Sequence, residues 1–112
     1  MTRQASLGEF EQLVLLAVLR LADGAYATRV SAELEGKAGR RLSRGALYSS
    51  LDRLEAKGFL SWSLEAPSAE RNGHPARRFE VTERGLAALR EQHAAMKRLA
   101  AGLEDVLEGG RG

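Results

Sequence analysis

The spacing of apolar residues predicts a helix in the middle of the chain. Leu47, Leu51 and Leu54 recur at helical spacing, so one side of this helix would be buried. Ser43 is a typical N-cap, and Gly58 is typical of the residue at which a helix ends in the left-handed conformation. The other side carries arginines, serines and a tyrosine, which is how a helix that enters a DNA groove looks. An ordinary amphipathic surface helix with solvated arginines fits the same pattern.

Two more helices are expected before this one. The first runs from about Leu7 to Leu21, and the segment Ser6-Leu7-Gly8-Glu9 fits a capping box at its start. Residues 13–19 are apolar on every side, so a second surface must cover this helix. The next helix spans Tyr26 to Glu35, with Gly36 as its stop. Three short helices with tight connections predict a helix-turn-helix unit.

The residues after the third helix change to the period of a strand. Leu60, Trp62 and Leu64 alternate with polar residues, and residues 77–81 can form the second strand of a hairpin. The intervening loop holds both prolines and is polar and basic, which is typical of a wing that lies along DNA. A plain hairpin that covers the core is the alternative. Trp62 on the inward face of its strand is more often a core residue than part of a ligand pocket.

A long C-terminal helix is expected from Glu83, capped by Thr82, to about Leu107. Apolar side chains follow one another along it at heptad spacing. A helix of roughly 25 residues is about 37 Å long, which exceeds what a small domain can cover. We therefore expect a second copy of the chain to complete the seam, with each last helix packed on the partner's first helix. The expected dimer interface contains Leu13, Leu16, Leu86, Leu89, His93, Met96, Leu99, Ala100, Leu103 and Leu107.

Composition excludes several classes of site. The 112-residue chain has no cysteine, so disulfides, thiolate metal sites and cysteine nucleophiles are excluded. Two histidines, His74 and His93, are too few for a metal cluster, and we expect His93 to be a structural histidine. No glycine-rich phosphate loop follows a strand, so no catalytic residue, metal or cofactor is expected. No apolar run approaches the ~20 residues of a membrane span, and the N-terminus has no signal-peptide core, so we expect a cytoplasmic protein without a membrane partner.

Charge is unevenly distributed along the chain. The net charge is only +2, but residues 28–78 hold ten Lys and Arg against six Asp and Glu. A basic centre between nearly neutral ends favours a polyanion-binding face, although the excess is small. Ser43, Arg44 and Arg53 are the leading contacts to base edges or phosphates, and Tyr48 and Ser49 are expected at phosphates. The full set of candidate DNA contacts is Thr28, Arg29, Ser43, Arg44, Gly45, Tyr48, Ser49, Arg53, Arg71, Asn72, His74 and Arg77.

The order of these parts resembles the PadR-like transcriptional regulators, which are winged-helix repressors of bacteria. The likeness rests on five elements. They are Leu7-Gly8-Glu9-Phe10-Glu11, Gly45-Ala46-Leu47-Tyr48, Leu51-Asp52-Arg53-Leu54-Glu55, Gly58-Phe59-Leu60, and Arg78-Phe79-Glu80-Val81-Thr82 before Gly85. The chain resembles the short subgroup, which has one long C-terminal helix. The family often has glycine where this chain has Ala27.

The residues and the resemblance together predict a mainly α protein with a small β-hairpin (α+β). Residues 1–81 would form a winged helix-turn-helix DNA-binding domain, residues 82–108 a dimerisation helix and residues 109–112 a flexible tail. The expected function is a homodimeric, sequence-specific transcriptional regulator, most simply a repressor on a palindromic operator. The sequence leaves open whether a small-molecule effector, not identified, releases the DNA. The alternative function is a winged-helix module that binds another protein and has no sequence-specific DNA binding.

Overall fold

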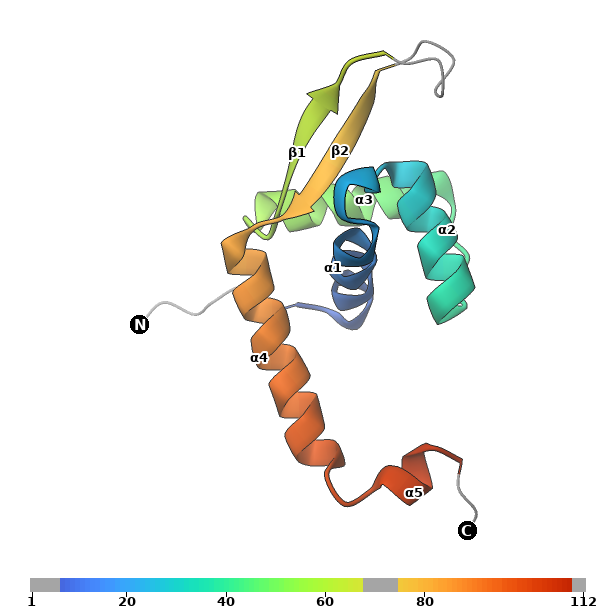
Figure 1. Ribbon diagram of the computed structural model, residues 1–112, viewed down its shortest axis with the longest axis vertical. Helices are drawn as coiled ribbons and strands as arrows, with labels where there is room; N and C mark the ends of the chain where they lie inside the picture. Colours follow the sequence, from blue (N-terminus) through green and yellow to red (C-terminus); the bar gives the residue numbers. More distant parts are fainter. Residues whose placement is uncertain (1–6, 68–74, 110–112) are drawn as a thin grey trace.

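The computed structural model describes residues 7–67 and 75–109, and it arranges helices around a central helix with a hairpin on one side (Figure 1). Helix α1 is followed by a short 3-10 turn, by α2 and α3, by the hairpin β1–β2 and by two C-terminal helices. The element bounds are α1 Glu9–Leu21, η1 Ala22–Gly24, α2 Ala27–Ala38, α3 Arg44–Ala56, β1 Leu60–Glu65, β2 Ala76–Val81, α4 Glu83–Ala100 and α5 Glu104–Leu107.

The core lies where α1, α2, α3 and the hairpin meet. The predicted apolar face of α3 is confirmed, because Leu47, Leu51 and Leu54 are all buried. Helix α1 lies at the centre and contacts α2, α3, α4 and β2, which explains why its middle is apolar on more than one side. The largest fully buried side chains are Phe79, Leu15, Leu34, Leu51, Leu54, Val14 and Val30.

The helix ends agree with the sequence for α3 and differ for α1 and α2. In α3, the Ser43 hydroxyl accepts a hydrogen bond from the Ala46 N–H at 3.1 Å, as predicted. In α1, the carboxylate that accepts from the cap N–H belongs to Glu11 and not to Glu9. Helix α2 continues past Gly36 to Ala38, and Gly39, whose φ of 66° is left-handed, caps its end. A glycine inside a helix costs only about 1 kcal/mol, so Gly36 alone does not end α2.

The hairpin is antiparallel, and its base belongs to the core. The register pairs Leu60 with Val81, Trp62 with Phe79, and Leu64 with Arg77. Leu60 and Phe79 are buried, whereas Trp62 and Leu64 on the same face are exposed further along. The prediction that Trp62 is a core residue is therefore wrong, because the hairpin extends beyond the helices that cover its base.

The C-terminal helix is attached firmly at its start. The Thr82 hydroxyl accepts from the Gly85 N–H at 3.0 Å and donates to the Gly58 carbonyl at 2.7 Å. A Cβ atom at position 85 would lie 2.2 Å from the Phe59 carbonyl oxygen, so only glycine allows this close approach. Leu89 is buried in the next turn. Beyond this point α4 runs away from the helix cluster (Figure 1).

The prediction of one continuous helix to Leu107 is wrong. Helix α4 ends at Ala100, and Gly102 adopts a left-handed φ of 86°. The Leu103 N–H then bonds the Ala100 carbonyl in a turn before α5. Leu107 therefore lies on a separate short helix, with Leu103 as its N-cap, and neither residue continues the seam of α4. In the described part of the chain, no helix combines the length and the apolar character that a membrane span needs.

Candidate nucleic-acid interface

The start of α3 presents a free cation beside α2. Arg44 is the first residue of α3 and is exposed. No residue in the described part of the chain forms an ion pair or hydrogen bond with its guanidinium. The capped helix start also carries the positive end of the helix dipole, which attracts anions. Arg44 is thus placed, and left available, for a negatively charged or electron-rich partner.

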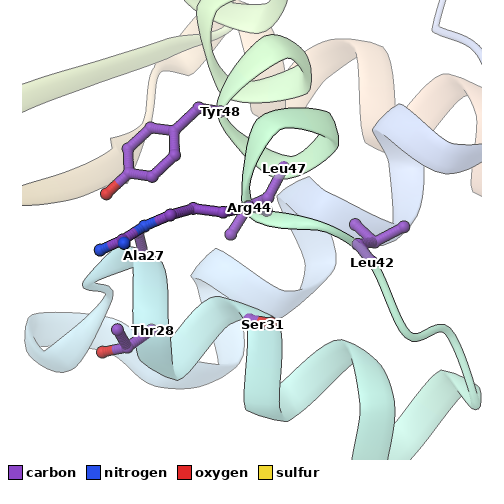
Figure 2. Close-up of a pocket in the computed structure, with 7 residues that line it drawn as sticks. All are labelled: Ala27, Thr28, Ser31, Leu42, Arg44, Leu47 and Tyr48. Carbon is purple, nitrogen blue, oxygen red and sulfur yellow. The ribbon is translucent and has the colours of Figure 1, made fainter.

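An open cleft of about 250 Å³ separates the starts of α2 and α3 (Figure 2). Its lining residues are Ala27, Thr28, Ser31, Leu42, Arg44, Leu47 and Tyr48. Figure 2 shows the Arg44 guanidinium and the hydroxyls of Thr28 and Tyr48 pointing to the same side of the helix pair. A cation with two hydroxyl donors is the set of groups that proteins use at the phosphates of DNA.

A second cation, Arg77, joins the hairpin to α3. Its guanidinium carbon lies 4.8 Å from the centre of the Trp62 ring and 5.9 Å from the centre of the Tyr48 ring. The three side chains come from β2, β1 and α3, so the contact spans the turn between the third helix and the hairpin. Among the described residues, no carboxylate forms an ion pair with Arg77. The positive charge of Arg77 therefore remains available at this junction.

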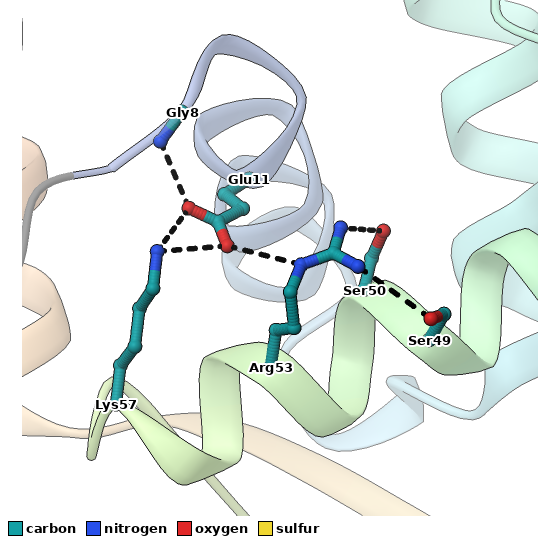
Figure 3. A network of polar contacts seen from close by, with 6 residues as sticks. All are labelled: Gly8, Glu11, Ser49, Ser50, Arg53 and Lys57. Carbon is teal, nitrogen blue, oxygen red and sulfur yellow. Dashed lines mark hydrogen bonds and ion pairs between the residues drawn. The ribbon is translucent and has the colours of Figure 1, made fainter.

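Arg53, expected as a leading DNA contact, also makes contacts within the protein, and its side chain remains 55% exposed (Figure 3). Its guanidinium donates to the Ser50 hydroxyl at 3.2 Å and lies 3.6 Å from the Glu11 carboxylate. The same carboxylate accepts two hydrogen bonds from Lys57, at 2.8 and 3.0 Å. Glu11 belongs to α1, and both cations belong to the end of α3, so this network fastens α3 to the central helix.

Glu11 is buried and ionised in this network. Only 6% of its surface is exposed. Burial by itself raises the pKa of a carboxyl, but the hydrogen bonds from Lys57 and Gly8, with the charges of Lys57 and Arg53, outweigh it. The pKa of Glu11 is therefore lowered from its ordinary value of 4.5. The end of α3 is held by a charged group throughout the neutral range.

Arg78, the neighbour of Arg77, is neutralised in the same way. It lies on the opposite face of β2 and pairs with Glu65 and Glu80, at 3.2 Å each. The hydrogen bond that Arg78 donates to the Glu65 carboxylate is the main reason that the pKa of Arg78 is raised. Two adjacent arginines of one strand thus differ, since one has acidic partners and the other has aromatic ones.

The remaining candidate contacts vary in their surroundings. Ser49 is exposed, and its hydroxyl accepts a hydrogen bond from Arg53 at 3.5 Å. The guanidinium carbon of Arg29 lies 6.0 Å from the centre of the Tyr26 ring. No atom lies near the position of a Cβ on Gly45, so that part of α3 is open to an approaching backbone. Arg71, Asn72 and His74 lie outside the described residues. The sequence analysis missed Ser31, whose position four residues after Ala27 on α2 was the available signal.

The candidate dimer residues divide into buried and exposed groups. Leu89 is buried, and Leu13 is partly buried against the core of the same chain. Leu16, Met96 and Leu99 are exposed, at 47%, 63% and 78%. A groove of about 390 Å³ lies between α1 and α4, lined by Gln12, Leu16, Leu19, Leu86, Leu89, Arg90, His93 and Met96. In the described residues, no group of histidine and acidic side chains is arranged to hold a metal ion.

The model of the Transcriptional regulator PadR-like family matches residues 15–91, from α1 into α4. The chain belongs to this family. The matched range contains the helix-turn-helix, the hairpin and the first part of α4, so the structural features described above are those of a PadR-like regulator. Its fold is a winged helix, a DNA-binding fold, as the resemblance implied.

Solved structures of PadR-like regulators and of another winged-helix protein share this fold. A PadR-like transcription factor from Bacteroides fragilis is 26% identical, with a TM-score of 0.67, over 87% of this chain and 88% of the other. A PadR family transcriptional regulator from Eggerthella lenta is 27% identical, with a TM-score of 0.64, over 91% and 88%. F93 from STIV, a winged-helix DNA-binding protein, shares the fold at 23% identity and a TM-score of 0.60, over 87% and 98%. No curated protein matches the chain.

Proposed function

We propose that this PadR-like regulator binds a specific DNA site as a homodimer and represses transcription in the cytoplasm. The observation that carries this proposal is the distribution of free charge. Among the described residues, Arg44 and Arg77 have no acidic partner; Arg44 lines the same cleft as Tyr48, and the Arg77 guanidinium carbon lies 5.9 Å from the centre of the Tyr48 ring. Arg53 and Arg78 instead form ion pairs within the protein. Free cations next to hydroxyl donors suit DNA better than a protein surface.

Each candidate residue receives a role from its position. Arg44 at the start of α3 would read a base edge in the major groove, because arginine pairs specifically with guanine there. Thr28, Arg29, Ser43, Tyr48 and Ser49 would bind phosphates, and Gly45 would allow close approach. Arg77, with Arg71, Asn72 and His74 of the wing, would contact the backbone or the adjacent minor groove. We assign Arg53 to holding α3 in place, because its guanidinium is directed at Ser50 and Glu11.

The homodimer proposal rests on the exposed apolar side chains of α1 and α4. Leu16 and Met96 line the groove between these helices, and Leu99 extends the apolar surface along α4. The α4 helix of a second copy would fill the groove and cover these residues, with His93 and Ala100 along the contact. Leu103, the N-cap of α5, and Leu107, its last residue, are 47% and 62% exposed and would add to this contact.

Two-fold symmetry of the protein would be mirrored in a palindromic operator. The two α3 helices would enter successive major grooves about 34 Å apart. A small molecule bound between the subunits would change this spacing and release the DNA, since affinity depends on both helices fitting at once.

Selection of duplexes from a random pool tests the proposal directly. We expect enrichment of one inverted repeat, bound by two chains as measured by sedimentation. Met96→Glu with Leu99→Glu should abolish both the dimer and tight binding, because the charges lie on exposed positions of α4 and leave the core intact. Recovery of no preferred sequence would overturn specific DNA binding and favour a module that binds an acidic protein. Tight binding by a monomeric variant would overturn the dimer.

A further inference from the structure

Trp62 has no role in the core or in the proposed DNA contacts. It is the single tryptophan of the chain and lies on β1, opposite the buried Phe79. Its own surface is 38% exposed, whereas that of Phe79 is 1% exposed. Packing in the core therefore does not account for the exposed part of the ring.

The ring of Trp62 holds Arg77. The two residues face each other diagonally across the hairpin, because Leu64 is the direct partner of Arg77 and Trp62 lies two residues away on the same face. The guanidinium carbon lies 4.8 Å from the Trp62 ring centre, within the range of a cation–π contact. The Tyr48 ring of α3 lies at 5.9 Å from the same carbon. Arg77 therefore contacts both the hairpin and the third helix.

Stacking on the Trp62 ring leaves the N–H donors of the Arg77 guanidinium available for hydrogen bonds. A guanidinium that packs its plane on a ring keeps its N–H donors free at the edge of that plane, in the fork geometry that suits a phosphate. A hydrogen-bonded carboxylate would occupy those donors, as Glu65 and Glu80 occupy donors of Arg78. The stack also limits the rotamers of a long side chain before DNA binds, which reduces the entropy lost in binding.

We propose that Trp62 is a positioning residue that holds Arg77 against Tyr48, so that the wing and α3 meet DNA as one preorganised surface. This inference rests on the proposed function, because it assigns Arg77 a DNA phosphate. Trp62 itself is assigned no contact with a base or a phosphate. Its contribution to DNA affinity passes through Arg77 and depends on that residue being present.

A double-mutant cycle tests the coupling. The probes are a duplex selected by the wild-type protein and a mixed-sequence duplex of equal length. We expect Trp62→Leu to weaken binding of both duplexes about three- to tenfold, with an unchanged salt slope because no charge is lost. Arg77→Ala should weaken binding and flatten the salt slope by about one unit. In the Arg77→Ala background, Trp62→Leu should have no further effect.

A conservative variant and a spectroscopic signal separate positioning from a structural role. Arg77→Lys keeps the charge but loses the planar stack, so we expect it to weaken binding without changing the salt slope. The emission of Trp62 in the free protein should shift in Arg77→Ala and remain unchanged in Arg78→Ala, the matched control on the other face of β2. Trp62→Phe, which keeps an aromatic ring, should retain most of the affinity and serves if Trp62→Leu unfolds.

The outcomes distinguish the two proposals. If the wild-type protein binds neither duplex, the proposed function fails. If it binds but Trp62→Leu and Arg77→Lys bind equally well, or if Trp62→Leu and Arg77→Ala weaken binding independently, the positioning role alone is overturned.

Discussion

Arg44 at the beginning of α3 and Arg53 near its end have identical side chains in different surroundings. Arg44 is exposed, has no acidic partner in the described residues and borders the cleft with α2. Arg53 lies beside the buried Glu11 carboxylate and donates to Ser50. Under the proposed function the first turn of α3 would meet DNA, whereas the other end of the helix is fastened to the protein. A recognition helix needs both, since a helix that is not held in place cannot present its first turn in a fixed orientation.

The hairpin repeats this division within two consecutive residues. Arg78 is bound by Glu65 and Glu80 on one face of β2, whereas Arg77 stacks on Trp62 and Tyr48 on the other. Net charge alone does not reveal this division, because all four arginines count equally in it. What matters for DNA is which cations have acidic partners inside the fold.

The largest expected effect comes from the junction that holds the end of α3 to α4. Gly85→Ala places a methyl group where only 2.2 Å separates it from the Phe59 carbonyl oxygen. We expect a loss of about 3 kcal/mol or more in the free energy of unfolding, because the clash is with backbone and cannot be relieved by a rotamer change. Urea denaturation measures it. Gly36→Ala is the control, because no atom lies within 4 Å of its added methyl, and it should not destabilise.

The next largest effect should follow from removing the Glu11 carboxylate, which fastens the end of α3 to α1. Glu11→Ala leaves Lys57 and Arg53 without their shared partner, and we expect about 2 kcal/mol of destabilisation because both cations can still reach water. Thermal melting and urea denaturation measure the loss. Glu9→Ala, at the exposed pair with Arg40, should change stability by less than 1 kcal/mol. Equal losses in the two variants would contradict the anchoring role of Glu11.

A direct comparison of the two arginines should give a smaller effect on DNA binding. Arg44→Ala is expected to cost about 1.5 kcal/mol of affinity for the selected duplex and less for a mixed-sequence duplex, if Arg44 reads a base. Its unfolding should be unchanged. Arg53→Ala should instead lower stability slightly and reduce the affinity for both duplexes equally. Fluorescence anisotropy measures both variants, and a selective loss in Arg53→Ala would reverse the assignment of the two ends.

The smallest expected effect is a dependence of stability on pH. Because the pKa of Glu11 in the folded protein is below its ordinary 4.5, the charged network stabilises the fold above that pH. The contribution is lost as pH falls through 4.5 and then through the lowered value. The difference in unfolding free energy between wild type and Glu11→Gln should therefore shrink below about pH 4.5. A constant difference down to about pH 3 would show that the charge of Glu11 is not responsible.

Local patterns predicted most of the elements. The apolar spacing of Leu47, Leu51 and Leu54, the Ser43 cap and Gly58 placed α3 correctly, because each of these signals acts within a few residues. The prediction of a long C-terminal helix failed at Gly102. The heptad spacing of apolar residues continues past this position, but the backbone there leaves the helical conformation. Spacing records which side chains are apolar, but it does not record the conformation of the glycine between them.

The sequence by itself determined the helix-turn-helix and hairpin, the basic middle of the chain and the likeness to PadR-like regulators, since these depend on residue type and short-range order. Only the tertiary structure decided which of the four arginines, Arg44, Arg53, Arg77 and Arg78, have acidic partners among the described residues. Glu11 meets Lys57 from 46 positions away, and Arg77 meets Tyr48 across the turn between helix and hairpin. A charge is neutralised by whatever lies a few ångströms from it, and for these residues folding brings together partners that are remote along the chain.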